Sequence, residues 1–350
     1  MKLQRIIEKH WYLKSDLLLT ILLLPLSLIY ELITTIRRYL FKLKIKPSTR
    51  LAVPVVIIGN ISVGGAGKTP LTKYLAQTLS TQGIKVGIIL RGYKSSTTAA
   101  KIVSAQDDSH EVGDEALIYA QAGHRVAIGA KRVAAGKLLL RQFPDTQLIL
   151  ADDGMQHYYL DRDLEICVVD SSRMFGNQQV LPLGPLREPM NRLNRVDALV
   201  VNGNYNHASL DQILLPYQKP IYYQELEFVT FFNPVTQTIA CVAEMKNTSI
   251  MAMAAIGNPG RFFDYLEQLG LKINQWQAFP DHYHYQAADI NPKYAIITTE
   301  KDYTKLAQFK ADNIWIAVVQ AKLNNEKPID SIKDLIKYRT INRGYQLIRN

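Results

Sequence analysis

The sequence predicts an α/β fold, with a parallel sheet covered by helices on both faces and a smaller α/β lobe after it. The main evidence is an alternation of short apolar runs with longer amphipathic segments, which begins near residue 51. This alternation stops at residues 221–245, where extended segments follow each other without a helix, and then it restarts. A long apolar segment precedes the alternation. We therefore expect four parts, which are residues 1–50, 51–220, 221–245 and 246–350.

Residues 1–50 predict a membrane-associated helix. The run 17–30, LLLTILLLPLSLIY, has fourteen residues without a charge. As a helix it would be ~21 Å long, which is less than the ~30 Å of a hydrocarbon core, and Pro25 would bend it. No small-residue cleavage site follows it, and the next residues include six cations, Arg37, Arg38, Lys42, Lys44, Lys46 and Arg50. We expect a helix that lies in, or dips into, an anionic cytoplasmic leaflet, and the alternative is a core helix that caps the globular part.

Strands of the main part are expected at its short apolar runs, whose nearly continuous apolar character is typical of parallel strands covered on both faces. These runs are residues 53–58, 85–90, 125–129, 147–151, 164–169 and 197–201. At 221–245 we expect two extended strands around Asn233 and Pro234, which form a hairpin that links the lobes. The second lobe would begin with a strand at 250–256.

Composition places the chain among folded proteins, because 47% of its 350 residues are hydrophobic and 21% are charged. These fractions exclude a disordered chain and a chain embedded wholly in a membrane. The formal net charge of +10 favours an anionic partner, such as nucleic acid, a phospholipid surface or a phosphorylated substrate. The two cysteines, Cys167 and Cys241, are far apart, so we expect ordinary buried thiols in a reducing compartment.

A glycine-rich turn, GNISVGGAGKTP at residues 59–70, follows the first predicted strand. Such a turn surrounds phosphate oxygens with backbone N–H groups at the start of a helix, whose dipole favours negative charge. In this interpretation Lys68 contacts the β- and γ-phosphates, and the Thr69 hydroxyl binds Mg²⁺. Ser62 stands where the strict phosphate-loop pattern has glycine, and the alternative is a glycine-rich turn with an incidental lysine. The residues expected to hold the nucleotide are Ser62, Val63, Gly64, Gly65, Ala66, Gly67, Lys68 and Thr69.

Acidic residues follow another predicted strand in the segment LILADDGMQH. Asp152 and Asp153 stand at the strand end, where an acid can hold Mg²⁺ directly or through water opposite a phosphate loop. Adjacent residues point in different directions, so one carboxylate can face the metal while the other bonds backbone or substrate. The alternative is a pair of ordinary loop acids.

Two further segments carry titratable side chains, and the residues alone leave their roles open. In VGDEA, Asp114 and Glu115 stand at a probable helix start, and acids that answer the helix dipole are the stronger interpretation. In FPDHYHY, Asp281 precedes His282, which favours a tuned proton handler or a charge partner. Zinc is disfavoured because no matching ligand cluster stands at useful spacing.

Together these segments resemble one family, tetraacyldisaccharide 4'-kinase, the lipid A 4'-kinase of Gram-negative bacteria. The resemblance rests on GNISVGGAGKTP, LRGYK, VGDEA, DDGMQH, PLGPLREP, AIGNPGRFF, FPDHYHY and TTEKD, in the family's order. The family's loop resembles GNxSVGGxGKT, so Ser62 fits it, whereas Met155 stands where an aromatic residue is common. The resemblance implies transfer of the γ-phosphate of ATP to the 4'-hydroxyl of an acylated glucosamine disaccharide 1-phosphate, at the cytoplasmic face of the inner membrane. It also implies a P-loop NTPase sheet and a second α/β lobe, joined by a two-stranded linker, with the site in the cleft.

The resemblance also implies roles for individual residues. Asp114 would be the base that acts on the acceptor hydroxyl, and His282 would support it with Asp281 beside it. The expected catalytic residues are Lys68, Asp114, Asp281 and His282. The expected metal site is Thr69, Asp152 and Asp153. The residues expected near the lipid headgroup are His157, Arg187 and Glu188.

Two rival functions are less favoured. A membrane-associated P-loop ATPase of the partition or cell-division class typically has a loop like KGGxGKT, whereas Val63 stands at the place of its extra lysine. A nucleic-acid-binding protein would suit the net charge, but the basic residues cluster beside an apolar helix, and no stacking-aromatic ribbon or helix-turn-helix pattern occurs. We expect neither a nucleic-acid partner nor an obligatory protein partner.

Overall fold

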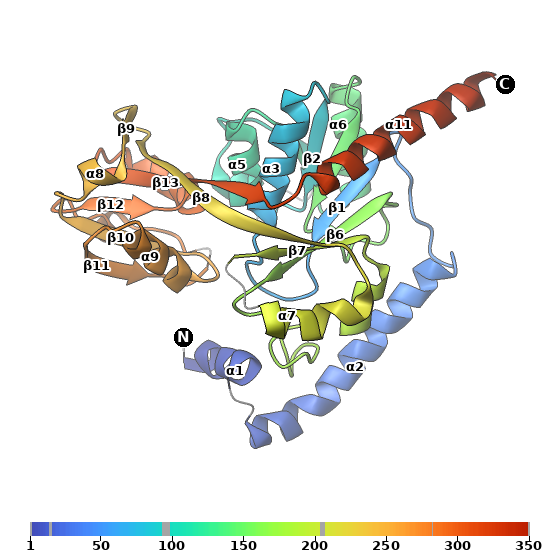
Figure 1. The fold of residues 1–350 in the computed structure, drawn as a ribbon, viewed down its shortest axis with the longest axis horizontal. Coiled ribbons are helices and arrows are strands. Elements are labelled where there is room, and N and C mark those ends of the chain that lie inside the picture. The colour runs from blue at the N-terminus through green and yellow to red at the C-terminus, as the bar shows by residue number, and fades with distance from the viewer. Residues whose placement is uncertain (1, 14–15, 93–98, 204–206, 282, 349–350) are drawn as a thin grey trace.

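A single sheet connects the two lobes of the molecule in the computed structural model (Figure 1). The structure describes residues 2–13, 16–92, 99–203, 207–281 and 283–348. Along the sheet the strand order is β11-β10-β12-β13-β8-β7-β6-β1-β5-β2-β4-β3, and β9 pairs with β8 outside this path. The first lobe contains the strands from β7 to β3, and the second contains β10, β11 and β12 (Figure 1).

Strands of the first lobe are parallel except for β3, which pairs antiparallel to β4 at the edge. They are β1 Val55–Gly59, β2 Val86–Leu90, β3 Lys101–Val103, β4 Arg125–Ile128, β5 Leu148–Asp152, β6 Leu164–Asp170 and β7 Ala198–Asn202. The helices around them are α3 Lys68–Thr81, α4 Ser109–Val112, α5 Asp114–Gln121, α6 Arg132–Gln142 and α7 His207–Leu214. The sequence prediction of a parallel sheet with helices on both faces is confirmed. The three-residue strand β3 was not predicted.

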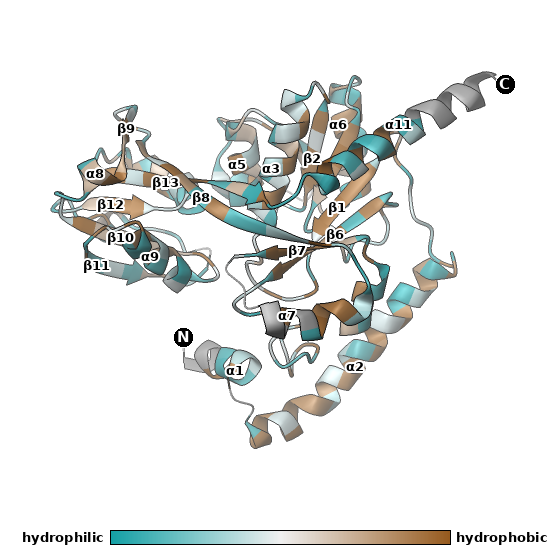
Figure 2. Ribbon diagram, viewed as in Figure 1, coloured by the Kyte–Doolittle hydropathy of each residue, from teal (hydrophilic) through white to brown (hydrophobic). Residues whose placement is uncertain are grey.

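Both faces of this sheet are buried, which explains the continuous apolar runs. In β1, Val56 and Ile58 belong to the hydrophobic cluster that contains Leu75 of α3, whereas Val55 and Ile57 belong to the cluster on the other face. Successive side chains of a strand point to opposite faces, so each face receives alternate residues. The hydropathy colouring shows apolar residues throughout these strands (Figure 2).

The link between the lobes differs from the predicted hairpin within 221–245. It consists of β8 Ile221–Asn233, which runs parallel to β7 at its start, and β13 Ile314–Leu323, which pairs with β8 antiparallel along most of its length. The short β9 Thr238–Ala240 pairs only with the last residues of β8. The second linking strand therefore comes from about 80 residues further along the chain, and although its apolar run favours a strand, nothing local indicates that it pairs with β8.

The second lobe also ends earlier than the predicted range 246–350. It contains α8 Val242–Met245, β10 Ile250–Ala254, α9 Pro259–Gln268, β11 Ile273–Ala278, β12 Ala295–Thr298 and α10 Glu300–Leu306. The helix α11 Lys327–Ile348 returns to the first lobe, where Ile329 and Ile332 join the core cluster of α3 (Figure 1). Residues after β13 thus complete the first lobe.

Two helices precede the sheet, α1 Lys2–Tyr12 and α2 Leu17–Lys42. The helix α2 has 26 residues, so it is about 39 Å long and continues well beyond the apolar run that predicted it. Among the described residues it is the one helix that is long and apolar enough to cross a membrane, judged by length and composition alone.

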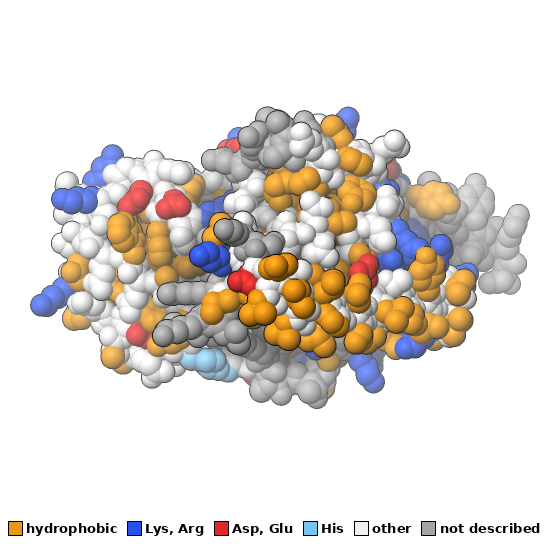
Figure 3. Space-filling view, turned by 90° about the horizontal axis from the view of Figure 1, so that it is seen from below, with side chains coloured by type: hydrophobic (Ala, Val, Ile, Leu, Met, Phe, Trp, Pro, Cys, Tyr) orange, Lys and Arg blue, Asp and Glu red, His pale blue; other side chains and the backbone are white. Residues whose placement is uncertain are grey.

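A polar and aromatic face attaches α2 to the first lobe. The Ser27 hydroxyl donates to the Val180 carbonyl at 2.8 Å, and Arg38 Nη1 donates to Asn191 Oδ1 at 3.0 Å. The ring of Phe41 packs edge-on against Tyr159. The apolar face, by contrast, is exposed and forms a band of hydrophobic side chains on the lower side of the molecule (Figure 3). The helix therefore buries its polar side, the reverse of the amphipathic pattern of a soluble helix.

Both cysteines are free thiols, as expected, but only Cys167 is buried. Burial raises the pKa of the Cys167 thiol to about 12, which makes it unreactive at neutral pH. Cys241 is exposed beside α8, so the prediction of two buried thiols was wrong for this residue.

Replacement of Ile332 by Ala should test whether α11 is part of the core of the first lobe. Because the Ile332 side chain is fully buried against the cluster of α3, we expect the free energy of unfolding to fall by about 2–5 kcal/mol. Lys333→Ala, a partly exposed neighbour on the same helix, should change it by less than about 0.5 kcal/mol. Chemical denaturation measures both. Equal, small effects of the two variants would show that α11 is not a stable part of this core.

Candidate functional site

The glycine-rich turn forms an open loop between β1 and α3. Gly64 has φ 103° and Gly67 has φ 89°, conformations that residues with a side chain rarely adopt. A Cβ atom built on Gly65 would have no heavy atom within 4 Å, so space remains in front of the loop backbone. The α3 helix begins at Lys68, directly after this loop. An open turn with free space, placed at a helix start, fits a phosphate group.

Two buried amides hold the end of the loop. A Cβ on Gly67 would lie only 2.1 Å from Asn202 Nδ2, so only glycine allows this approach. Gln224 Nε2 lies 2.8 Å from Asn202 Oδ1 and 3.3 Å from the Gly67 carbonyl oxygen. Since Gln224 is on β8, the strand that links the lobes also fixes the phosphate loop.

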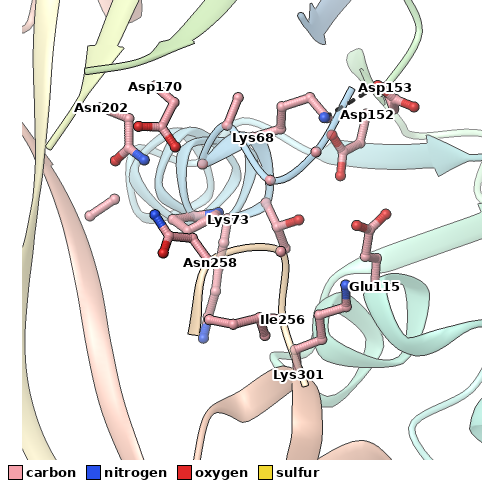
Figure 4. Close-up of a pocket in the computed structure, with 18 of the residues that line it drawn as sticks. Lys68, Lys73, Glu115, Asp152, Asp153, Asp170, Asn202, Ile256, Asn258 and Lys301 are labelled. Atoms are coloured by element: carbon pink, nitrogen blue, oxygen red, sulfur yellow. Dashed lines mark ion pairs between the residues drawn. The ribbon is translucent and has the colours of Figure 1, made fainter. Parts of the chain in front are cut away.

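Lys68 extends from the loop toward the ends of two strands (Figure 4). Its ammonium group lies 3.4 Å from Asp153 Oδ1 and donates to Asn60 Oδ1 at 3.2 Å. Asp153 has φ 48°, a left-handed turn that directs its carboxylate to Arg187 Nη1 at 2.9 Å as well. Although burial raises the pKa of Asp153, the charges of Lys68 and Arg187 together lower it well below its ordinary value.

Asp152 has different partners from Asp153. It is the last residue of β5 and is almost completely buried. The Tyr119 hydroxyl donates to its Oδ2 at 2.6 Å, whereas its Oδ1 has no hydrogen-bond partner among the described residues. Burial and the negative charge of Glu115 raise the pKa of Asp152 to about 7. A buried carboxylate oxygen without a partner fits a cation ligand.

The donor set suits Mg²⁺ better than zinc. No group of three or more His, Cys, Asp or Glu side chains within the described ranges could hold a metal. Mg²⁺ is usually held by one or two carboxylates together with phosphate oxygens and water, and Asp152, Asp153 and the Thr69 hydroxyl offer such a set. Thr69 lines the same cleft as both acids.

These residues line a cleft of about 1720 Å³ that lies between the lobes. The first lobe contributes the phosphate loop and the acids, and the second contributes Gly257, Asn258 and Lys301 (Figure 4). A Cβ on Gly257 would lie 3.1 Å from the backbone nitrogen of Gly65, so a loop of the second lobe approaches the phosphate loop directly.

Polar contacts hold the lobes together around the cleft. Arg173 Nη2 donates to the Gly257 carbonyl at 3.0 Å, and Lys73 Nζ of α3 lies 2.8 Å from Glu300 Oε1 of α10. The rings of His110 and His284 stack with centroids 4.8 Å apart. These contacts hold the two lobes against each other beside the cleft.

The predicted base Asp114 is the first residue of α5, after the positive φ of Gly113. Its carboxylate pairs with Lys305 of α10 at 3.1 Å. Its neighbour Glu115 lines the cleft, near Lys301 (Figure 4). Asp281 pairs with Lys301 at 3.1 Å, and its expected partner His282 lies outside the described residues.

The three predicted headgroup residues have unequal surroundings. Arg187 is bound to Asp153, as described above. Glu188 is buried and accepts hydrogen bonds from Gln156 Nε2 at 3.0 Å and from the Tyr158 hydroxyl, so its carboxylate is already engaged. His157 is half-buried in the cleft, and its Nε2 has no partner in the described part of the chain. Burial and nearby positive charges, of which Arg132 is the largest, lower the pKa of His157 to about 4.

Several residues of the cleft were not identified from the sequence as site residues. They are Arg37, Lys73, Arg91, Arg132 and Lys301; outside the lining, Tyr119 and Lys305 were missed as well, and they contact Asp152 and Asp114. Arg91 and Lys301 stand inside segments that carried the resemblance, LRGYK and TTEKD, but no role was attached to them. A signal did exist for Arg132, because a cation in the first turn of a helix opposes the dipole and requires another partner. Arg132 Nη2 donates to the Asp153 carbonyl at 3.2 Å.

Comparison with known proteins agrees with this geometry. The family model described as tetraacyldisaccharide-1-P 4'-kinase matches residues 19–337. The curated tetraacyldisaccharide 4'-kinase of Chromobacterium violaceum is 44% identical and covers 91% of this chain and 94% of its own length. That of Shewanella oneidensis is 41% identical, with 92% of each chain covered. A crystal structure of LpxK from Aquifex aeolicus in complex with ATP has a TM-score of 0.76 and 31% identity, and it covers 92% of this chain and 99% of that one.

His157 should make folding stability depend on pH. Its folded pKa of about 4 is below the ordinary 6.5, so its contribution is complete above pH 6.5 and is lost as the pH falls toward 4. Since the ring is partly exposed and its charge is partly screened by water, we expect an effect of about 1 kcal/mol, or about 2–4 °C in Tm. Thermal melts of the wild type and His157→Gln between pH 7 and about 4.5 should show a smaller drop for the variant. Equal decreases of Tm with pH in the two proteins would contradict the lowered pKa of His157.

Proposed function

Because the chain belongs to the tetraacyldisaccharide-1-P 4'-kinase family and is a kinase, we propose that it transfers the γ-phosphate of ATP to the 4'-hydroxyl of an acylated glucosamine disaccharide 1-phosphate. The product is the 1,4'-bisphosphate of lipid A biosynthesis. The observation that carries the proposal is the open loop of Gly64, Gly65 and Gly67, which ends at Lys68 and lines the same cleft as Asp152 and Asp153.

The phosphate loop and Lys68 hold the triphosphate of ATP in this proposal. Lys68 gives up its contact with Asp153 and follows negative charge on the β- and γ-phosphates, so it contributes most where that charge increases during transfer. Arg187 stays beside Asp153 and keeps that carboxylate ionised. Phosphoryl transfer needs positioning and charge neutralisation more than covalent chemistry, and both are supplied by groups already fixed by neighbouring strands.

Mg²⁺, when bound by Thr69, Asp152 and Asp153, would neutralise and orient the phosphate oxygens. The unpartnered Oδ1 of Asp152 is the atom that supports this assignment. Tyr119 holds the other carboxylate oxygen and so sets the orientation of the acid.

Asp114 is the proposed base for the acceptor hydroxyl. A sugar hydroxyl is a poor nucleophile, and a carboxylate within hydrogen-bond reach assists it as the new bond forms. Asp114 stands at the start of α5, one residue before the cleft-lining Glu115. Asp281 and His282 of the second lobe are proposed to support it once the lobes close, which would limit hydrolysis of ATP without acceptor.

The acceptor headgroup is proposed to bind on the side of the cleft that faces α2. Arg37, Arg91, Arg132 and Arg187 line this side, and their charges suit a phosphorylated sugar. His157, which is neutral at pH 7, provides a hydrogen-bonding ring among these cations. Glu188 acts here through the buried contacts that fix Tyr158 and Gln156.

The membrane is proposed to meet the chain along α2, at the cytoplasmic face of the inner membrane. The exposed apolar face of α2 would lie among the acyl chains, while cations near its C-terminal end meet anionic headgroups. Its contacts with the first lobe extend from Ser27 to Phe41, so more than half of the helix lies along the protein. This favours a helix in the interface over one that crosses the bilayer.

Purified chain, incubated with Mg²⁺, labelled ATP and the acylated disaccharide 1-phosphate, should yield a bisphosphorylated lipid. Lys68→Ala should lower this rate by at least about 10²-fold, because it removes a cation that stabilises developing charge. Lys246→Ala, a substitution in the second lobe away from the cleft lining, serves as control and should retain the rate. ATP hydrolysis that depends on protein concentration and ignores the lipid would favour the partition-type ATPase instead.

Replacement of Leu18, Ile21 and Leu22 by Ser should weaken membrane binding without undocking α2. These side chains are 76%, 64% and 66% exposed, so the change removes apolar surface from the lipid-facing side only. We expect at least about 10-fold weaker sedimentation with vesicles of phosphatidylethanolamine and phosphatidylglycerol. Ile239→Ser, at a 72% exposed position of the second lobe, is the matched control. Equal binding of the triple variant and the control would place the membrane contact elsewhere.

A further inference from the structure

An ion pair connects the first residue of α5 to the second lobe. Lys305 Nζ, on α10, lies 3.1 Å from Asp114 Oδ2, on α5. The Lys305 side chain is 5% exposed and that of Asp114 is 10% exposed, so both charges are almost removed from water. The pair is therefore unlike the exposed Lys322–Glu227 pair of the linker, whose side chains are 66% and 54% exposed.

Burial of these charges makes them depend on each other. A lysine or an aspartate without its partner in such a place would lose hydration with no compensation, whereas the pair compensates both. Since the partners belong to different lobes, each is compensated in this way only while α10 packs against α5. The orientation of the Asp114 carboxylate therefore depends on contact between the two lobes.

A second carboxylate, that of Asp302, lies near enough to Lys305 to interact with its charge. Asp302, one turn earlier on α10, is fully buried and accepts from the Thr299 hydroxyl at 2.7 Å. Burial raises the pKa of Asp302, and the charge of Lys305 opposes this increase. The ammonium group of Lys305 is therefore attracted by a carboxylate of its own lobe and presented to Asp114 from the other.

Other cations on α10 and near it pair with carboxylates other than that of Asp114. Lys301 pairs with Asp281, and Lys73 pairs with Glu300 at the N-terminal end of α10. Of these, the Lys73 pair also joins the lobes, but its side chains are 29% and 30% exposed and it does not involve Asp114. It offers a comparison in which the lobes lose one contact while the proposed base keeps its partner.

From this arrangement we propose that Lys305 is a positioning residue for the transfer step. It orients the Asp114 carboxylate and supplies its opposite charge when the second lobe closes on the first, so that the base is set only in the closed state. The inference rests on the proposed role of Asp114 in the kinase reaction. Lys305 does not touch ATP or the acceptor in this proposal.

Lys305→Met tests it by removing the charge while keeping most of the side-chain length. We expect kcat for lipid phosphorylation to fall about 30-fold with KM for ATP unchanged within about 3-fold, because transition-state positioning is lost and nucleotide binding is kept. Lys305→Arg should recover most of kcat, and Lys322→Met should retain it.

A double-mutant cycle separates this role from general stabilisation. In an Asp114→Asn background, Lys305→Met should change the residual kcat by less than about 2-fold, because the residue acts through Asp114. The double variant also removes both buried charges, so it lacks the unpaired buried carboxylate that Lys305→Met alone leaves. The inference would be overturned if Lys305→Met lowered kcat in the Asp114→Asn variant by the same factor as in the wild type, or if Lys305→Met alone kept the wild-type kcat. A wild type that does not phosphorylate the lipid would instead overturn the proposed function.

Discussion

The antiparallel pairing of β8 with β13 is the interaction on which the rest of the structure depends. It continues the sheet of the first lobe into the second, so the lobes are joined by a ladder of backbone hydrogen bonds. The same strand β8 carries Gln224, which bonds the end of the phosphate loop. A movement of the linker would therefore shift Gly67 through the hydrogen bond of Gln224. The position of the nucleotide and the angle between the lobes are set by one element.

Charge in the cleft follows from this arrangement. The strands β1 and β5 end side by side and bring Lys68 and Asp153 together, while Arg132 and Arg187 approach from flanking segments. Acids and cations are equal in number over the whole lining, but Arg37, Arg91 and Arg132 act together on His157 at the side that faces α2. This local group of arginines suits phosphate groups, which both proposed substrates, a triphosphate and a phosphorylated lipid, carry.

Local features could be predicted from the sequence, and contacts between distant segments could not. The signals for β1 and the phosphate loop each lie within a few consecutive residues, the apolar run before Gly59 and the glycines around Lys68, so both elements were predicted. The pairing of β8 with β13, the return of α11 to α3 and the pair of Asp114 with Lys305 join segments about 80 to 260 residues apart. No periodicity carries that information, because partner choice in a sheet and across a cleft is decided by the packing of the whole chain.

The position of α2 relates the cleft to the proposed membrane surface. Tyr30, Thr34 and Arg37 line the cleft, although the opposite side of the same helix carries the exposed leucines. The Tyr30 hydroxyl donates to the Arg187 carbonyl at 3.1 Å, and the side chain of the same Arg187 bonds Asp153. Acyl chains on one side of α2 and a sugar phosphate on the other would be separated by the width of a single helix, about 10 Å. An acceptor could then present its headgroup to Lys68 while its acyl chains remain in the bilayer, which explains why a nucleotide-binding fold carries an apolar helix at the edge of its active cleft.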